Sequence, residues 1–579
     1  MNTPERLVTE MCNGIAGAHP ELQFLEKFKI IKKKEVNSKK VTLISGGGSG
    51  HEPAHAGFVG KGMLDAAVCG DVFASPSQIQ VYKAIAETKS EKGTLLIIKN
   101  YSGDMMNFKN AAYLAEEDGI QVDYVKVDDD IAVEDSLYTV GRRGVAGTVF
   151  VHKIAGAAAE EGLELAKVKS IAEKVVANVK SIGFALTSCT VPAKGSPTFS
   201  LEEDELEYGV GIHGEPGIRR EKMQSADELA KKMTESLLKE LKAEQGEVAI
   251  LVNGFGGSPL QELYVFANSV LKCLSKTNVK AVRLYVGDYM TSIDMAGASL
   301  SILKLDEDLK KYLIAEANTP SFKLSGNEAD SEYAEVKPAD IQDDEVSFTV
   351  ETKESNAIIE DNQLSLQNVI YIVDKMSEVI IENEIPFCEL DAHAGDGDFG
   401  MSVAKGFKQL KREWKEIIEA SDTIGSFLEA CSLVIMEYCG GASGPIWGSA
   451  FRAAGKSAGQ RKTMGASDFA DMMQEAVRGI QATGERSFGR GAIVGDKTLM
   501  DALIPCADTW SEGAKKGTVI KELFIQGAKE AVQGAKETEQ IVARMGRAGA
   551  VGERSLGYPD AGAHGLGVIF TAIAESIVQ

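Results

Sequence analysis

Short apolar runs alternate with glycine-rich loops and helical stretches over about the first 330 residues. Runs of strand length occur at 41–45, 93–99, 121–127, 183–191, 247–252 and 281–286. Strands that alternate with helices are typical of layered α/β domains. The stretch 167–183 predicts a long helix before the strand at 183–191. We therefore place a boundary near residue 180, between a first α/β subdomain (1–180) and a second (181–325).

The pattern changes after residue 353. Apolar residues recur every three or four positions at Leu366, Val369, Ile370, Val373, Met376 and Ile380, which predicts an amphipathic helix. Similar patterns recur at 423–438, 466–481 and 524–545, and we find no strand candidate. The sequence thus predicts a separate all-α domain over 353–579. The acidic stretch between the two halves, assigned to 326–352, reads as a linker.

The amino-acid composition argues against several classes of protein, among them nucleic-acid-binding and membrane-spanning proteins. The 579 residues carry 62 Lys and Arg against 85 Asp and Glu, a net charge of −23. Such a chain is repelled by nucleic acid and by anionic membranes. No apolar run approaches the ~18 residues of a membrane span, and the N-terminus lacks a signal-peptide pattern. The eight Cys contain no CxxC pair, which favours buried thiols over zinc or disulfides. We expect a cytoplasmic protein.

Two glycine-rich motifs in the first half carry histidine. Gly46–Glu52 follows a predicted strand and is neither a Walker A loop nor a GxGxxG motif. We expect an anion-binding loop at a helix N-terminus, the alternative being a tight turn. In Gly211–Gly217, the glycines beside His213 leave room for a small ligand to reach the imidazole, which can attack a carbonyl. The alternative is a loop or helix-capping histidine. His19, His152 and His564 read as structural, and His55 as structural or supporting the site. His393, a single histidine without Cys partners, reads as a bystander rather than as the ligand of a softer metal.

Acidic residues suggest two further sites. Asp104 follows the strand at 93–99, where ligands of open α/β sheets bind. Asp391, Asp396 and Asp398 lie within eight residues, and their mutual repulsion favours a bound cation. Oxygen ligands suit Mg²⁺ shared with substrate phosphates, and two ions can clamp a polyphosphate. An acidic surface turn is the alternative.

Three more stretches of the second half resemble phosphate-binding elements. Gly440–Pro445 opens a predicted helix and offers backbone N–H groups to a phosphate. The stretch 546–562 contains two Arg in an irregular glycine-rich sequence, as a lid would. The turn 495–498 lies before another helix and joins this group. Together, a carbonyl-reactive histidine, a Mg²⁺ site and phosphate loops indicate phosphoryl transfer from Mg·ATP to a small hydroxylated carbonyl compound.

The motifs also carry a family resemblance. GGGSGHEPAHAGF, KNYSGD, GIHGEPG, GDGDFG and GDKTLMDAL occur in an order that resembles single-chain, ATP-dependent dihydroxyacetone kinases. The resemblance covers nearly the whole chain. It implies a two-subdomain α/β substrate domain, an antiparallel eight-helix barrel that binds ATP, and a homodimer. It implies that phosphate is transferred to dihydroxyacetone or another short ketose or aldose, such as glyceraldehyde.

The resemblance also implies residue roles. His213 holds the substrate as a hemiaminal, and Asp104 and His51 act as acid and base. Gly48, Ser49, Gly50 and Lys99 line the substrate pocket. Asp391, Asp396 and Asp398 bind two Mg²⁺ ions. The nucleotide contacts are Asp398, Phe399, Gly400, Met401, Ala442, Ser443, Gly444, Thr498, Leu499, Arg547, Asp560, Ala561 and Gly562.

The sequence departs from the family in the lid, where GRAGAVGERS and DAGA stand for the usual GRASYLGERS and DPGA. Three alternatives remain open. In one, a phosphoprotein recharges a bound nucleotide. In another, the chain also cyclises FAD as a lyase. In the third, it is a non-catalytic carbonyl-binding regulator.

Overall fold

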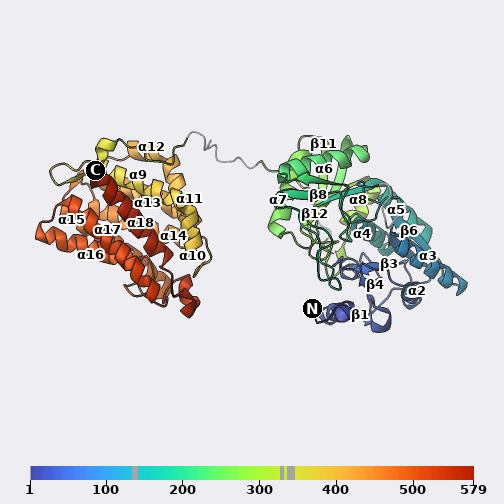
Figure 1. The fold of residues 1–579 in the computed structure, drawn as a ribbon. Helices are drawn as coiled ribbons and strands as arrows, with labels where there is room; N and C mark the ends of the chain where they lie inside the picture. Colours follow the sequence, from blue (N-terminus) through green and yellow to red (C-terminus); the bar gives the residue numbers. More distant parts are fainter. Residues whose placement is uncertain (1, 134–140, 326–330, 336–345, 579) are drawn as a thin grey trace. The chain divides into compact units, whose positions relative to one another are not determined.

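The computed structural model describes residues 2–133, 141–325, 331–335 and 346–578, without the side chains of Arg547, Ala550 and Val578. The chain divides into two compact units, Met1–Val336 and Lys337–Gln579. Figure 1 draws the first unit in blue to green and the second in yellow to red. Most of the expected linker lies outside the described residues.

A mixed six-stranded sheet forms the first half of the N-terminal unit. Its strand order is β1-β2-β4-β3-β5-β6, and β4, β3, β5 and β6 run parallel. The strands are β1 (Leu22–Leu25), β2 (Ile30–Lys33), β3 (Thr42–Ser49), β4 (Ala66–Val72), β5 (Thr94–Lys99) and β6 (Val122–Val127). Alternate residues face opposite sides: Ile44 packs under α2 (Gln78–Glu87) and α3 (Ser102–Glu117), whereas Leu43 faces a second core.

A second six-stranded sheet, of order β11-β10-β12-β7-β8-β9, packs on the other side of that second core. Its strands are β7 (Val179–Ala185), β8 (Glu205–Tyr208), β9 (Arg219–Lys222), β10 (Gln245–Gly254), β11 (Asn278–Gly287) and β12 (Gly297–Lys304). Helices α6 (Ala226–Glu240) and α7 (Leu260–Leu274) cover its outer face. The core between the sheets is filled by α4 (Thr148–Glu160), in which every residue from Thr148 to Ala159 is buried. Three further helices pack there: α1 (Leu7–Ala18), α5 (Leu165–Asn178) and α8 (Glu307–Ile314).

Three local predictions for the N-terminal unit were wrong. The Gly46–Ser49 run continues strand β3 because it pairs with β4, and no helix begins there. The helix expected over 167–183 ends at Asn178, and β7 takes the following residues. The sequence also missed β4 and β12, whose small residues hide the strand pattern. Two short strands, β13 (Ala317–Asn318) and β14 (Lys323–Leu324), close the unit.

The C-terminal unit is a ring of long helices, which confirms the expected all-α class. The long helices are α9 (Leu366–Glu382), α11 (Phe399–Arg412), α13 (Ile424–Tyr438), α14 (Ser443–Ala458), α15 (Ala466–Phe488), α16 (Met500–Lys516), α17 (Ile520–Glu537) and α18 (Ala561–Val578). Each of these eight contacts the next, and α18 contacts α9, so the ring closes (Figure 1). It encloses an apolar cavity of about 140 Å³.

Shorter elements complete the C-terminal unit. They are α10 (Glu384–Asp391), α12 (Trp414–Glu419) and two strands of two residues each, β15 (Leu364–Ser365) and β16 (Thr463–Met464). Those strands pair with each other and correct the expectation that this half contains none. Among the described residues, no helix is long and apolar enough to cross a membrane.

Candidate functional site

The glycines of strand β3 allow unusually close backbone approach. A Cβ atom on Gly46 would lie 2.4 Å from the Val68 carbonyl, and one on Gly48 2.6 Å from the Ala74 amide nitrogen. A Cβ on Gly47 would lie 2.5 Å from the Nζ atom of Lys99. Any larger residue in this strand therefore displaces either the neighbouring backbone or a buried ammonium group.

Two histidines from the two sheets meet beyond this strand. The Nε2 atoms of His51 and His213 are 3.3 Å apart. The Nδ1 atom of His51 lies 2.9 Å from the carbonyl oxygen of Thr291. Because a carbonyl only accepts hydrogen bonds, Nδ1 carries the proton, and the Nε2 lone pair of a neutral His51 is left to accept one.

Both imidazoles are held neutral. Burial is the largest cause that lowers the pKa of His213 to about 3, and the charges of Lys99 and Arg143 add to it. Burial, together with His213 and Lys99, also lowers the pKa of His51 well below its usual value. A neutral imidazole has the free electron pair that nucleophilic attack or proton acceptance requires.

The loop that carries His213 is braced from behind by an ion-pair network. The backbone N–H of His213 donates to Glu215 Oε2 at 2.9 Å, and Glu215 Oε1 lies 3.1 Å from Arg143 Nη1. Arg143 is buried and also pairs with Asp130 at 2.7 Å. A Cβ on Gly211 would collide with the Glu215 carboxylate, so that position requires glycine. This network holds the backbone of the loop at His213 in place.

Lys99 and Asp104 form the polar floor of the same site. Asp104 lies in the first turn of α3, buried, with Ser75 Oγ donating to its Oδ1 atom. Its Oδ2 atom is 4.0 Å from Lys99 Nζ. Burial raises the pKa of Asp104, whereas the charge of Lys99 opposes that shift. Burial also lowers the pKa of Lys99. Each shift moves the pKa of the group from its ordinary value toward neutrality, which favours proton transfer at neutral pH.

Four residues to which the sequence analysis gave no catalytic or binding role also lie at this site. His55 and His152 form a buried chain with Lys99: Lys99 Nζ is 3.2 Å from His55 Nε2, and His55 Nδ1 is 3.0 Å from His152 Nε2. The rings of Tyr101 and Phe73 pack edge-on against His213, with centroids 4.5 and 5.4 Å away. The sequence offered a direct signal for Tyr101, which lies inside KNYSGD, and for His55, which lies inside GGGSGHEPAHAGF.

Ser49 and Gly50 have specific partners at the pocket rim. Ser49 Oγ donates to the Gly70 carbonyl at 2.8 Å. The Gly50 carbonyl accepts from the Ile293 amide at 2.8 Å, and its own N–H donates to Glu52 at 2.9 Å. The second sheet's loop at residues 291–293 therefore holds the end of the glycine strand in place.

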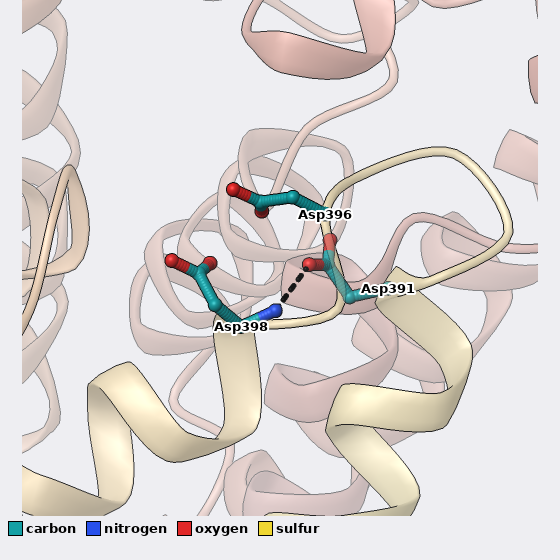
Figure 2. A group of neighbouring side chains, drawn as sticks. All are labelled: Asp391, Asp396 and Asp398. Atoms are coloured by element: carbon teal, nitrogen blue, oxygen red, sulfur yellow. Dashed lines mark hydrogen bonds between the residues drawn. The ribbon is translucent and has the colours of Figure 1, made fainter. Parts of the chain in front are cut away.

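In the C-terminal unit, three carboxylates converge between α10 and α11. One oxygen each from Asp391, Asp396 and Asp398 lies within 4.8 Å of the others, and Figure 2 shows the three side chains gathered around the loop. Asp391 Oδ2 accepts from the backbone N–H of Gly397 at 2.9 Å and of Asp398 at 3.2 Å. Burial raises the pKa of Asp391, and the charges of Asp396 and Asp398 raise it further. These hard oxygen donors fit Mg²⁺.

A pocket of about 200 Å³ adjoins the carboxylates. It brings together predicted residues from four segments: Asp391, Asp396, Asp398, Phe399, Ala442, Ser443, Thr498, Leu499, Asp560, Ala561 and Gly562. Three predicted contacts lie outside its lining. Gly400 packs against the Glu384 carbonyl, Met401 is 56% exposed, and Gly444 packs against the end of α13. The side chain of Arg547 lies outside the described residues.

Among the predicted nucleotide contacts, Asp560 has a strongly shifted pKa, which burial raises to about 7. Sequence reasoning assigned no role to two other residues near this pocket, Tyr558 and His393. The rings of Tyr558 and His393 stack at 3.8 Å between centroids and join the segment before α18 to the carboxylate loop. Lys497 also lines the pocket. Its sequence signals were its place in the turn 495–498 and in GDKTLMDAL.

Comparison with known proteins places each unit. Residues 13–321 match the Dak1 domain, and residues 393–575 match the DAK2 domain. A Pectobacterium atrosepticum L-erythrulose kinase is 32% identical over 99% of this chain and 95% of its own length. The dihydroxyacetone-binding subunit DhaK of a PTS-dependent dihydroxyacetone kinase from Lactococcus lactis is 54% identical over 53% of this chain and 93% of its own length.

A crystal structure of the dihydroxyacetone kinase from C. freundii in complex with AMP-PNP and Mg²⁺ is similar over the whole length. The TM-score is 0.62 at 30% identity, covering 100% of this chain and 99% of the other. The two units and their sites therefore define a kinase of small sugars. The chain belongs to the single-chain, ATP-dependent dihydroxyacetone kinase family, and the resemblance found in its motifs is confirmed.

Proposed function

We propose that this protein transfers the γ-phosphoryl group of Mg·ATP to dihydroxyacetone, held as a hemiaminal on His213. The facing His51–His213 pair, kept neutral by burial, is the observation that carries this proposal. The choice of dihydroxyacetone as the substrate is supported by the 54% identity to a dihydroxyacetone-binding subunit over the unit that holds the pair.

In this mechanism, a nitrogen of His213 adds to the carbonyl carbon of the substrate. The N–H proton passes to the carbonyl oxygen, so that one C–N bond forms and the C=O bond becomes a C–OH bond. His51 and Asp104 carry protons between these atoms. Glycerol lacks a carbonyl and forms no adduct, so covalent capture selects ketoses and aldoses.

Lys99 and the glycine strand orient the captured substrate. The Lys99 ammonium lies against Gly47 and near Asp104, where it can bind a substrate oxygen, and Gly48, Ser49 and Gly50 form the wall. Asp104 accepts the proton of the terminal hydroxyl as its oxygen bonds to the γ-phosphorus and ADP leaves.

The C-terminal unit supplies the donor. We assign Asp391, Asp396 and Asp398 as ligands of two Mg²⁺ ions, because their clustered oxygens suit that cation. Bound Mg²⁺ neutralises the phosphate charge that develops during transfer. The pocket residues contact the nucleotide, with Ser443 at the N-terminus of α14 facing a phosphate. Gly400, Met401, Gly444 and Arg547 keep their nucleotide roles only as proposals from the family resemblance. The same resemblance supports a homodimer.

The test is a coupled assay of ATP- and Mg²⁺-dependent phosphorylation of dihydroxyacetone, erythrulose and glycerol. We expect many turnovers with ATP, the highest kcat/KM for dihydroxyacetone, and no activity with glycerol. A single burst without turnover indicates a phosphoprotein donor instead. Release of AMP from FAD with Mn²⁺ identifies lyase activity. No reaction in either assay, together with tight dihydroxyacetone binding, favours the regulator.

A further inference from the structure

Lys497 projects from a rigid turn at the start of helix α16. The carboxylate of Asp501 accepts from the backbone N–H of Gly495 at 2.6 Å and of Thr498 at 2.8 Å. The neighbouring Asp496 is held by two hydrogen bonds from Arg490, at 2.5 and 2.9 Å. These hydrogen bonds therefore hold the backbone of Lys497 in place independently of the contacts of its side chain.

The ammonium group of Lys497 is enclosed by backbone carbonyls. The residue is 2% exposed, and its Nζ atom donates to the carbonyls of Thr538 and Tyr558, both at 2.8 Å, and to that of Ser555. These three carbonyls satisfy the three protons of the group. Burial lowers the pKa of Lys497, while nearby Asp560, Glu539 and Asp501 oppose the shift.

The three carbonyls mark both ends of one irregular segment. We call residues 541–559 the lid segment; it runs from the end of α17 and its short extension to the start of α18 and contains only single 3₁₀ turns. Thr538 lies just before it, and Ser555 and Tyr558 lie near its end. One buried side chain thus holds the entry and the exit of the segment together.

The lid segment is also connected to the carboxylate loop. The Tyr558 carbonyl bonds to Lys497, and the Tyr558 ring stacks on His393, inside the loop that carries Asp391 and Asp396. The interplanar angle of the stack is 7°. Loss of the Lys497 contact therefore moves a residue that touches the proposed metal loop.

We propose that Lys497 is a positioning residue that clamps the lid segment over the nucleotide pocket and, through Tyr558 and His393, aligns the lid with the carboxylate loop. The ammonium contacts protein carbonyls rather than substrate. A buried lysine costs stability unless its protons are bonded. Here two of the three bonds go to carbonyls of the lid segment and the third goes to Thr538, just before it. This inference rests on the proposed nucleotide role of the pocket.

The test compares Lys497→Met with Lys415→Met, a control on α12 whose side chain is 88% exposed. Trypsin cleaves after Arg544, Arg547 and Arg554, which all lie in the lid segment. We expect Lys497→Met to speed cleavage there at least about tenfold, as loss of one charge-assisted hydrogen bond predicts. The dissociation constant for Mg·AMP-PNP rises by a similar factor, and that for dihydroxyacetone stays unchanged. The control variant behaves as wild type.

Rescue separates positioning from general loss of structure. In Lys497→Ala, added propylammonium matches the three carbons and the ammonium group that are removed, and we expect it to restore lid protection and nucleotide binding in part. If Lys497→Met fails to fold, Lys497→Arg keeps the charge with a different donor geometry and is expected to speed lid cleavage in a folded protein. A folded Met or Arg variant with wild-type cleavage overturns the proposal. If wild-type protein binds no Mg·AMP-PNP, the proposed function fails, and lid cleavage alone decides the role of Lys497.

Discussion

His51 and His213 face each other with their Nε2 atoms 3.3 Å apart, although 162 residues separate them. His51 follows the glycine strand of the first sheet, and His213 lies in the loop after β8 of the second. Their meeting depends on the core between the sheets, which α4 fills. The candidate substrate site is therefore a product of tertiary packing, and its two halves are tested best by separate substitutions.

Replacing His213 by Ala removes the proposed nucleophile and leaves His51 in place. We expect loss of the covalent adduct and a rise of at least about 100-fold in the dissociation constant for dihydroxyacetone, equivalent to about 2.7 kcal/mol. Titration calorimetry and intact mass spectrometry measure both. His19→Ala, at a histidine in a different part of the unit, is the control. Unchanged binding in His213→Ala contradicts the covalent role.

Replacing Asp104 by Asn keeps the shape of the side chain and the bond from Ser75 but removes the proton acceptor. We expect kcat to fall by about 10²–10⁴-fold, with little change in KM. Single-turnover rates at saturating ATP measure the effect. Glu116→Gln, an exposed change on the same helix, controls for altered helix charge. A matched fall in substrate affinity instead makes Asp104 a binding residue.

The sequence reveals the main chemical groups of the site because glycine surrounds them. His51, His213 and the three aspartates all lie in glycine-rich motifs that no core requirement explains. It hides Arg143 and His152, because each acts through a contact, to Glu215 and to His55, that is made only when distant segments pack. The strand character of Gly46–Ser49 was equally hidden. Glycine disfavours strands locally, and here pairing with β4 overrides that preference.

The glycines of β3 differ in what an added methyl group meets. In Gly47→Ala, it meets the buried ammonium of Lys99 at 2.5 Å, and the φ of +155° at this position is one that side chains rarely adopt. We therefore expect a higher KM for dihydroxyacetone together with a loss of stability. In Gly48→Ala, the methyl group meets the backbone of Phe73 and Ala74 within 2.7 Å. That backbone yields at a cost of about 1–3 kcal/mol. Steady-state kinetics and urea unfolding of both variants check this. An unchanged KM in Gly47→Ala, or an unchanged free energy of unfolding in Gly48→Ala, contradicts it.

Acid should destabilise the N-terminal unit through buried His152. Burial is the main cause that lowers its pKa from 6.5 to about 3. At pH 7 both folded and unfolded states are neutral at this residue, whereas at pH 5 only the unfolded state binds the proton. The contribution of His152 alone then lowers the free energy of unfolding by about 2 kcal/mol between pH 7 and pH 5.

The variant His152→Gln isolates the contribution of His152 to the pH dependence of stability. Burial raises the pKa of Asp130 to about 6, which acts in the opposite direction, so the pH dependence of the wild type alone is a sum. We expect the stability difference between wild type and His152→Gln to shrink by about 2 kcal/mol from pH 7 to pH 5. Urea unfolding at both pH values measures it. A difference independent of pH shows that His152 titrates normally.

In the carboxylate cluster, we expect Asp396→Asn to change the melting temperature in opposite directions without and with Mg²⁺ and AMP-PNP. Without a cation, the charges of Asp396 and Asp398 repel that of Asp391 and raise its pKa. Asp396→Asn relieves part of this repulsion, so we expect a higher melting temperature than wild type in EDTA. With Mg²⁺ and AMP-PNP the order reverses, because the variant has lost a ligand and binds at least about tenfold more weakly. Asp391→Asn is less informative, since Asp391 also accepts from Gly397 and Asp398. Thermal melts and calorimetry measure both effects, and Asp422→Asn, at an exposed residue, is the control. If Asp396→Asn is stabilised in EDTA yet binds Mg·AMP-PNP as wild type does, Asp396 is not a metal ligand.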